Sequence, residues 1–164
     1  MRTRDVRSVV YLAAGLGLIV AIFAAAEFLD PSLRSVCTVN SFFSCGKVDA
    51  SALTSTLGVP DYLWGVLGFV AILLVAALAE RHRKDRRYAY ALLGLTTAGV
   101  GLSLYLLYVE LAEIQALCLV CASAYLLGGV AWLGAIELTR RALRRGPVAP
   151  PAAPSSGGGT VAKP

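Results

Sequence analysis

Four cysteines are the residues of this 164-residue chain whose type and spacing suit them for chemistry. Cys118 and Cys121 form a Cys-x-x-Cys pair, and Cys37 and Cys45 form a second pair with seven residues between them. A Cys-x-x-Cys pair is typical of thiol–disulfide exchange or of metal binding, because a thiolate is both a nucleophile and a metal ligand. The pair stands at the start of a long apolar run, so its chemistry depends on where that run is placed.

The elements that must position the cysteines are apolar helices. Hydrophobic residues make up 57% of the chain and charged residues only 15%. A helix needs about 20 apolar residues to cross a hydrocarbon core, and the chain has four such runs: residues 9–29, 62–79, 88–109 and 117–138. The sequence therefore predicts an all-α membrane protein, a four-transmembrane-helix bundle with a cysteine-bearing outer loop at residues 30–61.

Helix contacts are indicated in the first run, where a small residue recurs at every fourth position. A stripe of this kind lets helices pack closely in a membrane, and it consists of Ala13, Gly17, Ala21 and Ala25. The same run resembles a secretory signal peptide, but it is longer than the usual apolar region of about 7–15 residues. We therefore expect an uncleaved span.

The basic residues predict the orientation. The net charge is +5, and thirteen of the fifteen Lys and Arg residues flank the runs at the two termini and in the connection at residues 80–87. The positive-inside rule assigns these segments to the cytoplasm. Both termini are then cytoplasmic and all four cysteines face outside, as expected in a bacterial inner membrane. Basic patches interleaved with aromatic residues are absent from the sequence, so we expect no nucleic-acid partner.

Three parts of the chain are expected from composition. Residues 1–8 form a cytoplasmic N-terminus, and residues 9–140 form the membrane domain. Residues 141–164 are expected to form a disordered cytoplasmic tail, because they are rich in Pro, Gly, Ala and Ser.

Redox chemistry is favoured over three alternatives. The compartment outside the cytoplasm is oxidising, so disulfides form there readily. Structural disulfides fit the even cysteine count, but a Cys118–Cys121 bond closes a very small loop and would constrain little. The ligand spacing for zinc is loose and the only histidine, His82, lies in the cytoplasmic basic run, so no metal is predicted. The third alternative, ordinary buried cysteines, would account for one cysteine in a span better than for two cysteines in a Cys-x-x-Cys pair.

The position of the pair also suggests an electron acceptor. A cysteine near a helix N-terminus gains stabilisation of its thiolate from the helix dipole and free amides. Tyr125 continues the stripe of Cys118 and Cys121, and Gly128 and Gly129 leave space further along it. A dithiol beside a phenol and a cavity suits a lipid-soluble quinone, which takes two electrons. Cys37 and Cys45 in the loop are placed to exchange disulfides with a soluble partner.

The chain resembles the vitamin K epoxide reductase family in three segments set in a four-span frame. These are CTVNSFFSCGKVDAS from residue 37, GVPDYLWG from residue 58 and CLVCASAY from residue 118. The resemblance implies a four-helix bundle around a quinone. It also implies that Cys37 and Cys45 are the shuttle pair, that Cys45 forms a transient disulfide with Cys118, and that Cys121 lies next to the quinone.

Further residues carry over by the same resemblance. Tyr125 matches a tyrosine that hydrogen-bonds a quinone oxygen, and Ser51 matches a loop serine near the active site. Asp61 stands where mammalian members have an asparagine that contacts the other oxygen. No fused thioredoxin-like domain is expected, so the partner would be a separate exported DsbA-like protein.

The predicted function is therefore disulfide/quinone oxidoreduction, in which the partner is reoxidised and electrons pass to menaquinone, vitamin K or ubiquinone. Two alternatives remain: reduction of vitamin K quinone or epoxide as the main role, and a structural four-span protein with two stabilising disulfides.

Overall fold

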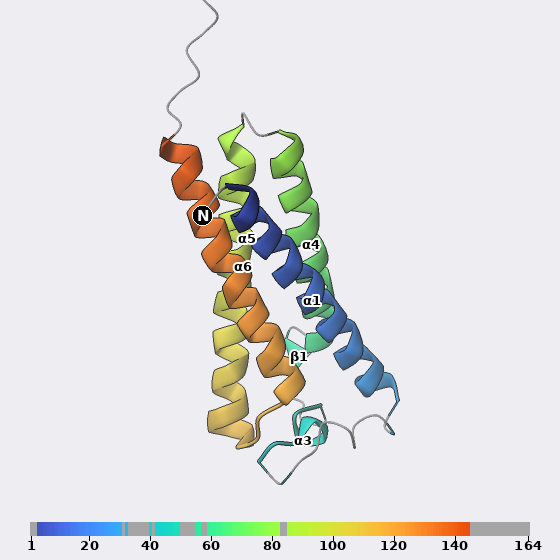
Figure 1. The fold of residues 1–164 in the computed structure, drawn as a ribbon. Coiled ribbons are helices and arrows are strands. Elements are labelled where there is room, and N and C mark those ends of the chain that lie inside the picture. The colour runs from blue at the N-terminus through green and yellow to red at the C-terminus, as the bar shows by residue number, and fades with distance from the viewer. Residues whose placement is uncertain are drawn as a thin grey trace, which may run out of the picture.

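The computed structural model describes residues 3–30, 32, 40, 42–49, 55–56, 59–82 and 85–144 (Figure 1). Four long helices dominate it: α1 (Thr3–Leu29), α4 (Asp61–Arg81), α5 (Arg86–Tyr108) and α6 (Leu119–Arg144). Each is long and apolar enough to cross a membrane, so the prediction of an all-α four-span bundle is confirmed. Two helices extend well beyond the predicted runs: α1 begins at Thr3 rather than at residue 9, and α6 continues to Arg144 rather than ending at residue 138.

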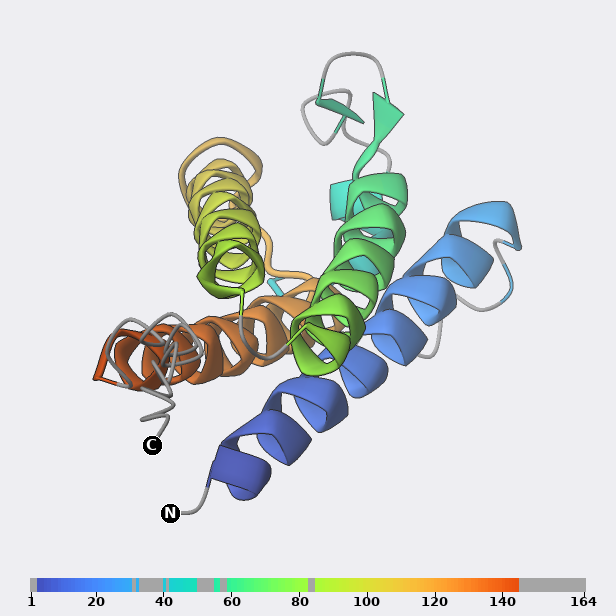
Figure 2. The ribbon, with the colours of Figure 1, turned by 90° about the horizontal axis from the view of Figure 1, so that it is seen from above.

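The four helices contact one another in a ring. α1 packs against α6 and α4, and α5 packs against the same two helices on the other side (Figure 2). Large apolar side chains such as Leu12, Ile19, Leu126 and Leu133 point out of the ring and are more than half exposed. This outward apolar surface is what a bilayer requires, since lipid tails are as apolar as leucine.

Small residues allow the helices to approach closely. Gly17 of α1 lies against the ring of Phe69 of α4, and Gly134 of α6 lies against Val10 of α1, so neither glycine has room for a Cβ. Ala13 and Ala21 of the predicted stripe are buried. The stripe thus packs the first helix, as its spacing predicts.

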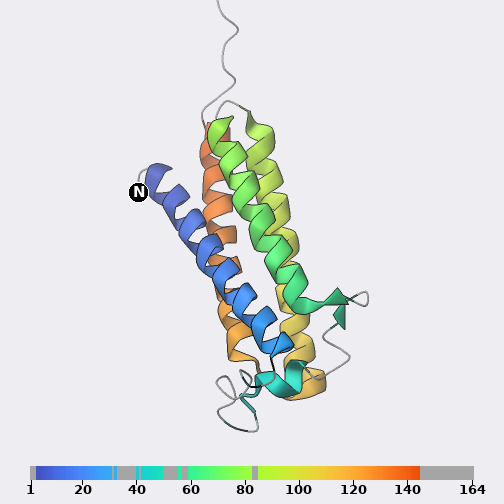
Figure 3. The same cartoon turned by 90° about the vertical axis from the view of Figure 1, so that its right-hand side faces the viewer.

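Short elements fill the segment between α1 and α4. Helix α3 (Cys45–Asp49) is followed by two paired antiparallel strands, β1 (Ser55–Thr56) and β2 (Val59–Pro60), which lead into α4. The hairpin projects from the side of the bundle near the start of α4 (Figure 3). Regular structure in this region was not predicted, because elements this short leave no periodic pattern.

The two ends of the bundle differ in composition. We call one the basic end; its arginines include Arg7, Arg81, Arg86, Arg87, Arg140, Arg141 and Arg144. We call the other the cysteine end; it contains Cys45, Cys118 and Cys121. The N-terminal end of α1, the C-terminal ends of α4 and α6 and the N-terminal end of α5 lie together at the basic end, whereas α3 and the start of α6 lie at the cysteine end.

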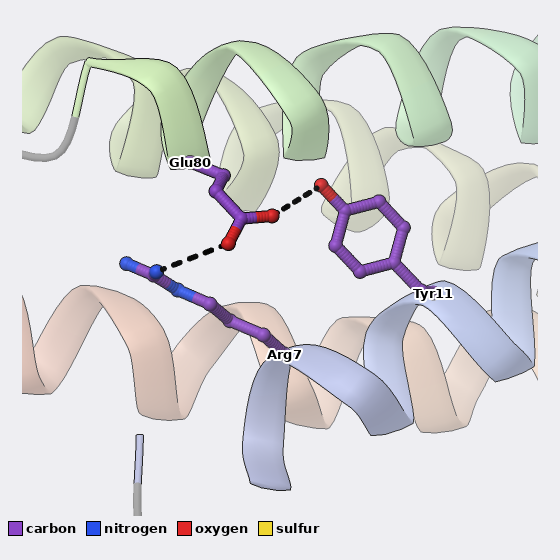
Figure 4. Close-up of polar contacts among 3 residues, drawn as sticks. All are labelled: Arg7, Tyr11 and Glu80. Atoms are coloured by element: carbon purple, nitrogen blue, oxygen red, sulfur yellow. Dashed lines mark hydrogen bonds and ion pairs between the residues drawn. The ribbon is translucent and has the colours of Figure 1, made fainter. Parts of the chain in front are cut away.

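Polar contacts fasten α1 to α4 at the basic end (Figure 4). Tyr11 donates its hydroxyl proton to Glu80 over 3.3 Å, and Arg7 Nη1 lies 3.8 Å from the other oxygen of the same carboxylate. Between α5 and α6, the Trp132 indole donates to Thr97 over 3.0 Å. These contacts hold the helices together away from the cysteines.

Candidate active site

Cys118 caps helix α6. Its carbonyl accepts the amide of Ala122 at 2.9 Å, and its sulfur accepts the amide of Cys121 at 3.2 Å. A side chain that accepts from the third residue of a helix is the usual N-cap arrangement. Cys118 immediately precedes α6, which begins at Leu119. This cap directs the backbone N–H group of Cys121 toward the sulfur of Cys118.

Cys45 lies directly against Cys118. The two sulfur atoms are 3.3 Å apart, and both residues are essentially inaccessible, Cys45 being 0% and Cys118 1% exposed. Cys45 is disulfide-bonded, whereas Cys118 and Cys121 are free thiols. A buried disulfide sulfur thus touches a buried thiol.

The surroundings of Cys45 differ from the sequence-based expectation. Cys45 was expected in a loop, but it is the first residue of α3 and packs in an apolar cluster with Val48, Ala116 and Cys118. Burial excludes water from the sulfur contact.

An irregular helix brings Cys118 to this position. Helix α5 continues as a π-helix, η2 (Val109–Ile114), and ends at Gln115, whose φ of 53° is in the left-handed region. Such a φ is uncommon for a residue other than glycine, and both it and π-helical turns occur often at functional sites. The chain reverses here, and Leu117 donates to the carbonyl of Phe42 over 2.8 Å. The segment before Cys118 is thereby tied to the segment before Cys45.

Glu110 of η2 holds the two sides of the site together. Its side chain is 2% exposed; Oε1 accepts the hydroxyl proton of Tyr125 at 2.7 Å, and Oε2 accepts the amide of Cys118 at 3.0 Å. Glu110 was not predicted from the sequence as a site residue. The available signal was a carboxylate at the edge of an apolar span, which in membrane proteins is a functional candidate by default.

A cavity of about 390 Å³ lies between the four helices next to these residues. Its walls are mostly apolar and come from all four helices, with Val48 of α3 at the cysteine end. Cys121, Tyr125 and Asp61 are among its few polar wall residues. Pockets of this size and character, apolar with a few polar groups, are typical sites for small apolar ligands.

Glycines keep the cavity open. Gly68 of α4, Gly99 of α5 and Gly128 of α6 line it, and a Cβ added to any of the three would meet no atom within 4 Å. The predicted space beside Gly128 is therefore present.

Five of the seven predicted site residues can be placed. Cys121, Tyr125 and Asp61 line one cavity, and the contact between Cys45 and Cys118 lies beside it. The other two, Cys37 and Ser51, fall outside the described residues.

The fold and this site together define a multi-pass membrane protein with Cys121 at the wall of an apolar cavity and, beside it, a contact between Cys118 and the disulfide-bonded Cys45. Residues 8–140 match the model of the vitamin K epoxide reductase family. The match covers most of the chain, and the chain belongs to this family. Members of the family are membrane oxidoreductases that are linked to quinones.

Proposed function

We propose that the protein is a thiol–quinone oxidoreductase that reoxidises a separate exported thioredoxin-fold, DsbA-like protein and thereby supports disulfide-bond formation. Electrons pass from the partner to Cys37 and Cys45, then to Cys118 and Cys121, and finally to a membrane quinone. The observation that carries this proposal is the 3.3 Å contact between a disulfide sulfur of Cys45 and the free thiol of Cys118.

Thiol–disulfide exchange between the two pairs conserves bonds and electrons. In the proposed relay, the partner reduces a Cys37–Cys45 disulfide, and the Cys45 thiolate attacks the sulfur of Cys118 in a Cys118–Cys121 disulfide. Cys121 leaves as a thiolate, and a Cys45–Cys118 bond forms. Cys37 then attacks Cys45 and releases Cys118. The product has an oxidised Cys45 and two reduced helix cysteines, which agrees with the redox state of these three residues in the structure.

The cavity supports the second half of the relay. A bound quinone supplies an acceptor for two electrons and two protons. Cys121 and Tyr125 line the cavity, and in this proposal Cys121 would give electrons to that acceptor while the Tyr125 hydroxyl would serve one of its oxygens. Asp61, at the start of α4, also lines the cavity and would be the second polar contact. The apolar lining excludes water from the transfer.

The distribution of charge supports an orientation for this relay. We propose that the basic end faces the cytoplasm, following the positive-inside rule, and that the cysteine end faces the outside of a bacterial inner membrane. The cysteines would then be placed where an exported partner delivers electrons, while the cavity remains within the depth of the bilayer.

Two cysteine substitutions test the chemistry. With a reduced Cys-x-x-Cys partner protein as donor, Cys118→Ser and Cys121→Ser should each lower the rate of quinone reduction by about 1,000-fold or more, because residues that act as a unit fail together. Ser123→Ala is the matched control, since Ser123 is an exposed residue of α6 whose hydroxyl donates only to the carbonyl of Leu119. A Cys121→Ser variant that retains its rate would contradict the assignment of Cys121 to the quinone side.

Trapping the mixed disulfide tests the contact itself. In Cys37→Ala/Cys121→Ser, only Cys45 and Cys118 remain, and mild oxidation should link them within one chain. In Cys37→Ala/Cys118→Ser, the remaining pair should link much less. Peptide mass spectrometry without reductant gives both yields. Equal yields would show that Cys118 is not the entry point for electrons.

A further inference from the structure

Glu110 lies between the sulfur contact and the cavity, and the proposed electron path gives it no part. It is almost completely buried, and its two oxygens hold different partners: Tyr125, which lines the cavity, and the backbone of Cys118, whose sulfur contacts Cys45. A carboxyl group at this depth in a membrane protein is costly, and such groups often mark proton pathways.

We propose that Glu110 holds a proton for Tyr125 and that the pair delivers one proton from the cysteine end into the cavity. This inference rests on the proposed function, since it concerns the protons that accompany the two electrons. Glu110 acts through Tyr125 and is therefore a positioning and proton-supplying residue.

Two hydrogen bonds at Glu110 indicate a path for a mobile proton. A backbone amide can only donate, so Oε2 accepts from Cys118. Oε1 and the hydroxyl oxygen of Tyr125 are 2.7 Å apart, so a proton can pass between these two atoms. When Glu110 is ionised, the phenol donates its single proton in a hydrogen bond to the carboxylate. When Glu110 is protonated, Oε1 donates to the phenol oxygen, and the phenol proton is free to point into the cavity.

The relay balances without a further reactant. Oxidation of Cys118 and Cys121 to a disulfide releases two electrons and two protons. Reduction of a quinone to a quinol consumes both electrons and both protons. Glu110 gives up its proton through Tyr125 and regains one of those released by the thiols, so the carboxyl group ends each cycle as it began.

A purely structural role for Glu110 makes a different prediction. Glutamine at this position keeps the shape of the side chain, its carbonyl accepts from the Cys118 amide, and its NH₂ group donates to the phenol oxygen. A structural role would survive this change. Proton supply would not, because an amide does not release a proton.

The test compares Glu110→Gln with the control Glu113→Gln, which removes an exposed carboxylate from the same helix η2. With a reduced partner protein and a short-chain quinone, Glu110→Gln should lower kcat by about 100-fold or more, the usual contribution of an acid–base group. KM for the quinone should stay close to that of the wild type. Formation of the Cys45–Cys118 disulfide in the Cys37→Ala/Cys121→Ser background should remain intact, which shows that the variant folds.

An infrared measurement on quinone-free protein gives a readout besides activity. With Cys118 and Cys121 reduced, the carbonyl band of a protonated carboxylic acid should be present in the wild type and in Glu113→Gln, and lost in Glu110→Gln. A kcat for Glu110→Gln equal to that of the wild type, or a band that persists in it, would overturn the proposal. If the wild type passes no electrons to a quinone while the band is lost in Glu110→Gln, the proposed function fails and the proton-holding role of Glu110 stands.

Discussion

A tyrosine donates a hydrogen bond to a glutamate at each end of the helix bundle. At the basic end, Tyr11 of α1 lies 3.3 Å from Glu80 of α4, whose side chain is 45% exposed (Figure 4). At the cysteine end, Tyr125 of α6 lies 2.7 Å from Glu110 of η2, which is only 2% exposed. The two pairs have the same chemistry in different surroundings.

The difference in burial distinguishes a contact that only holds two helices together from a contact with a chemical reason to be maintained. A polar contact open to solvent contributes little free energy, because water competes for both partners. A buried carboxyl group loses its hydration and is maintained only by the hydrogen bonds made to it. The pair at the basic end therefore holds α1 and α4 together with a small desolvation cost and a small contribution to stability. The pair at the cysteine end is costly to maintain, and its place between a dithiol and a cavity gives a chemical reason for it.

Removing the two phenol hydroxyls compares the pairs directly. Tyr125→Phe deprives a buried carboxyl group of a hydrogen-bond partner, so we expect a loss of about 1–3 kcal/mol in stability. We also expect a fall of about 100-fold or more in quinone reduction, because a proton donor is lost. Tyr11→Phe should cost under about 0.5 kcal/mol and leave the rate unchanged. Thermal unfolding in detergent and steady-state kinetics measure both effects. Equal losses in the two variants would show that burial does not separate the pairs.

Filling the cavity next to the buried pair should affect substrate binding. Gly128 and its neighbour Gly129 both have open space where a Cβ would be placed, but only Gly128 lines the cavity. Gly128→Leu should raise KM for a quinone by about 10-fold or more, in line with the effect of adding carbons to an apolar pocket. Gly129→Leu is the matched control and should bind as the wild type does. A matching rise in both variants would indicate that the quinone site lies elsewhere.

The sequence was sufficient to predict the four spans, because the length of an apolar run and the bilayer thickness determine a transmembrane helix almost alone. The sequence was insufficient to predict the residues at which the helices begin and end. Arg7 lies within α1 and Arg144 is the last residue of α6, and charged residues end a hydropathy run without ending a helix. Helix α3 was missed for another reason, since five residues are too few for a periodic signal.

For the site, spacing identified Cys121 and Tyr125, which lie on one wall because residues four apart share a face of a regular helix. Glu110 could not be placed by such a rule. It precedes Cys118 by eight residues, yet the π-helix and the left-handed Gln115 return the chain so that its carboxylate reaches the Cys118 amide. Irregular backbone of this kind is decided by tertiary contacts, which periodicity does not report.

The smallest expected effect is at the basic end and concerns Arg7 and Glu80, whose charged atoms are 3.8 Å apart with side chains 20% and 45% exposed. A double-mutant cycle with Arg7→Ala and Glu80→Ala should give a coupling energy of about 0.2–1 kcal/mol, as for other exposed ion pairs. The coupling should shrink as salt is added, because the Debye length falls from about 10 Å at 0.1 M to about 3 Å at 1 M. A coupling that stays above about 2 kcal/mol at high salt would mean that detergent or lipid shields this pair from water, as the protein shields Glu110. The two ends would then differ in their contacts with the site rather than in their exposure to water.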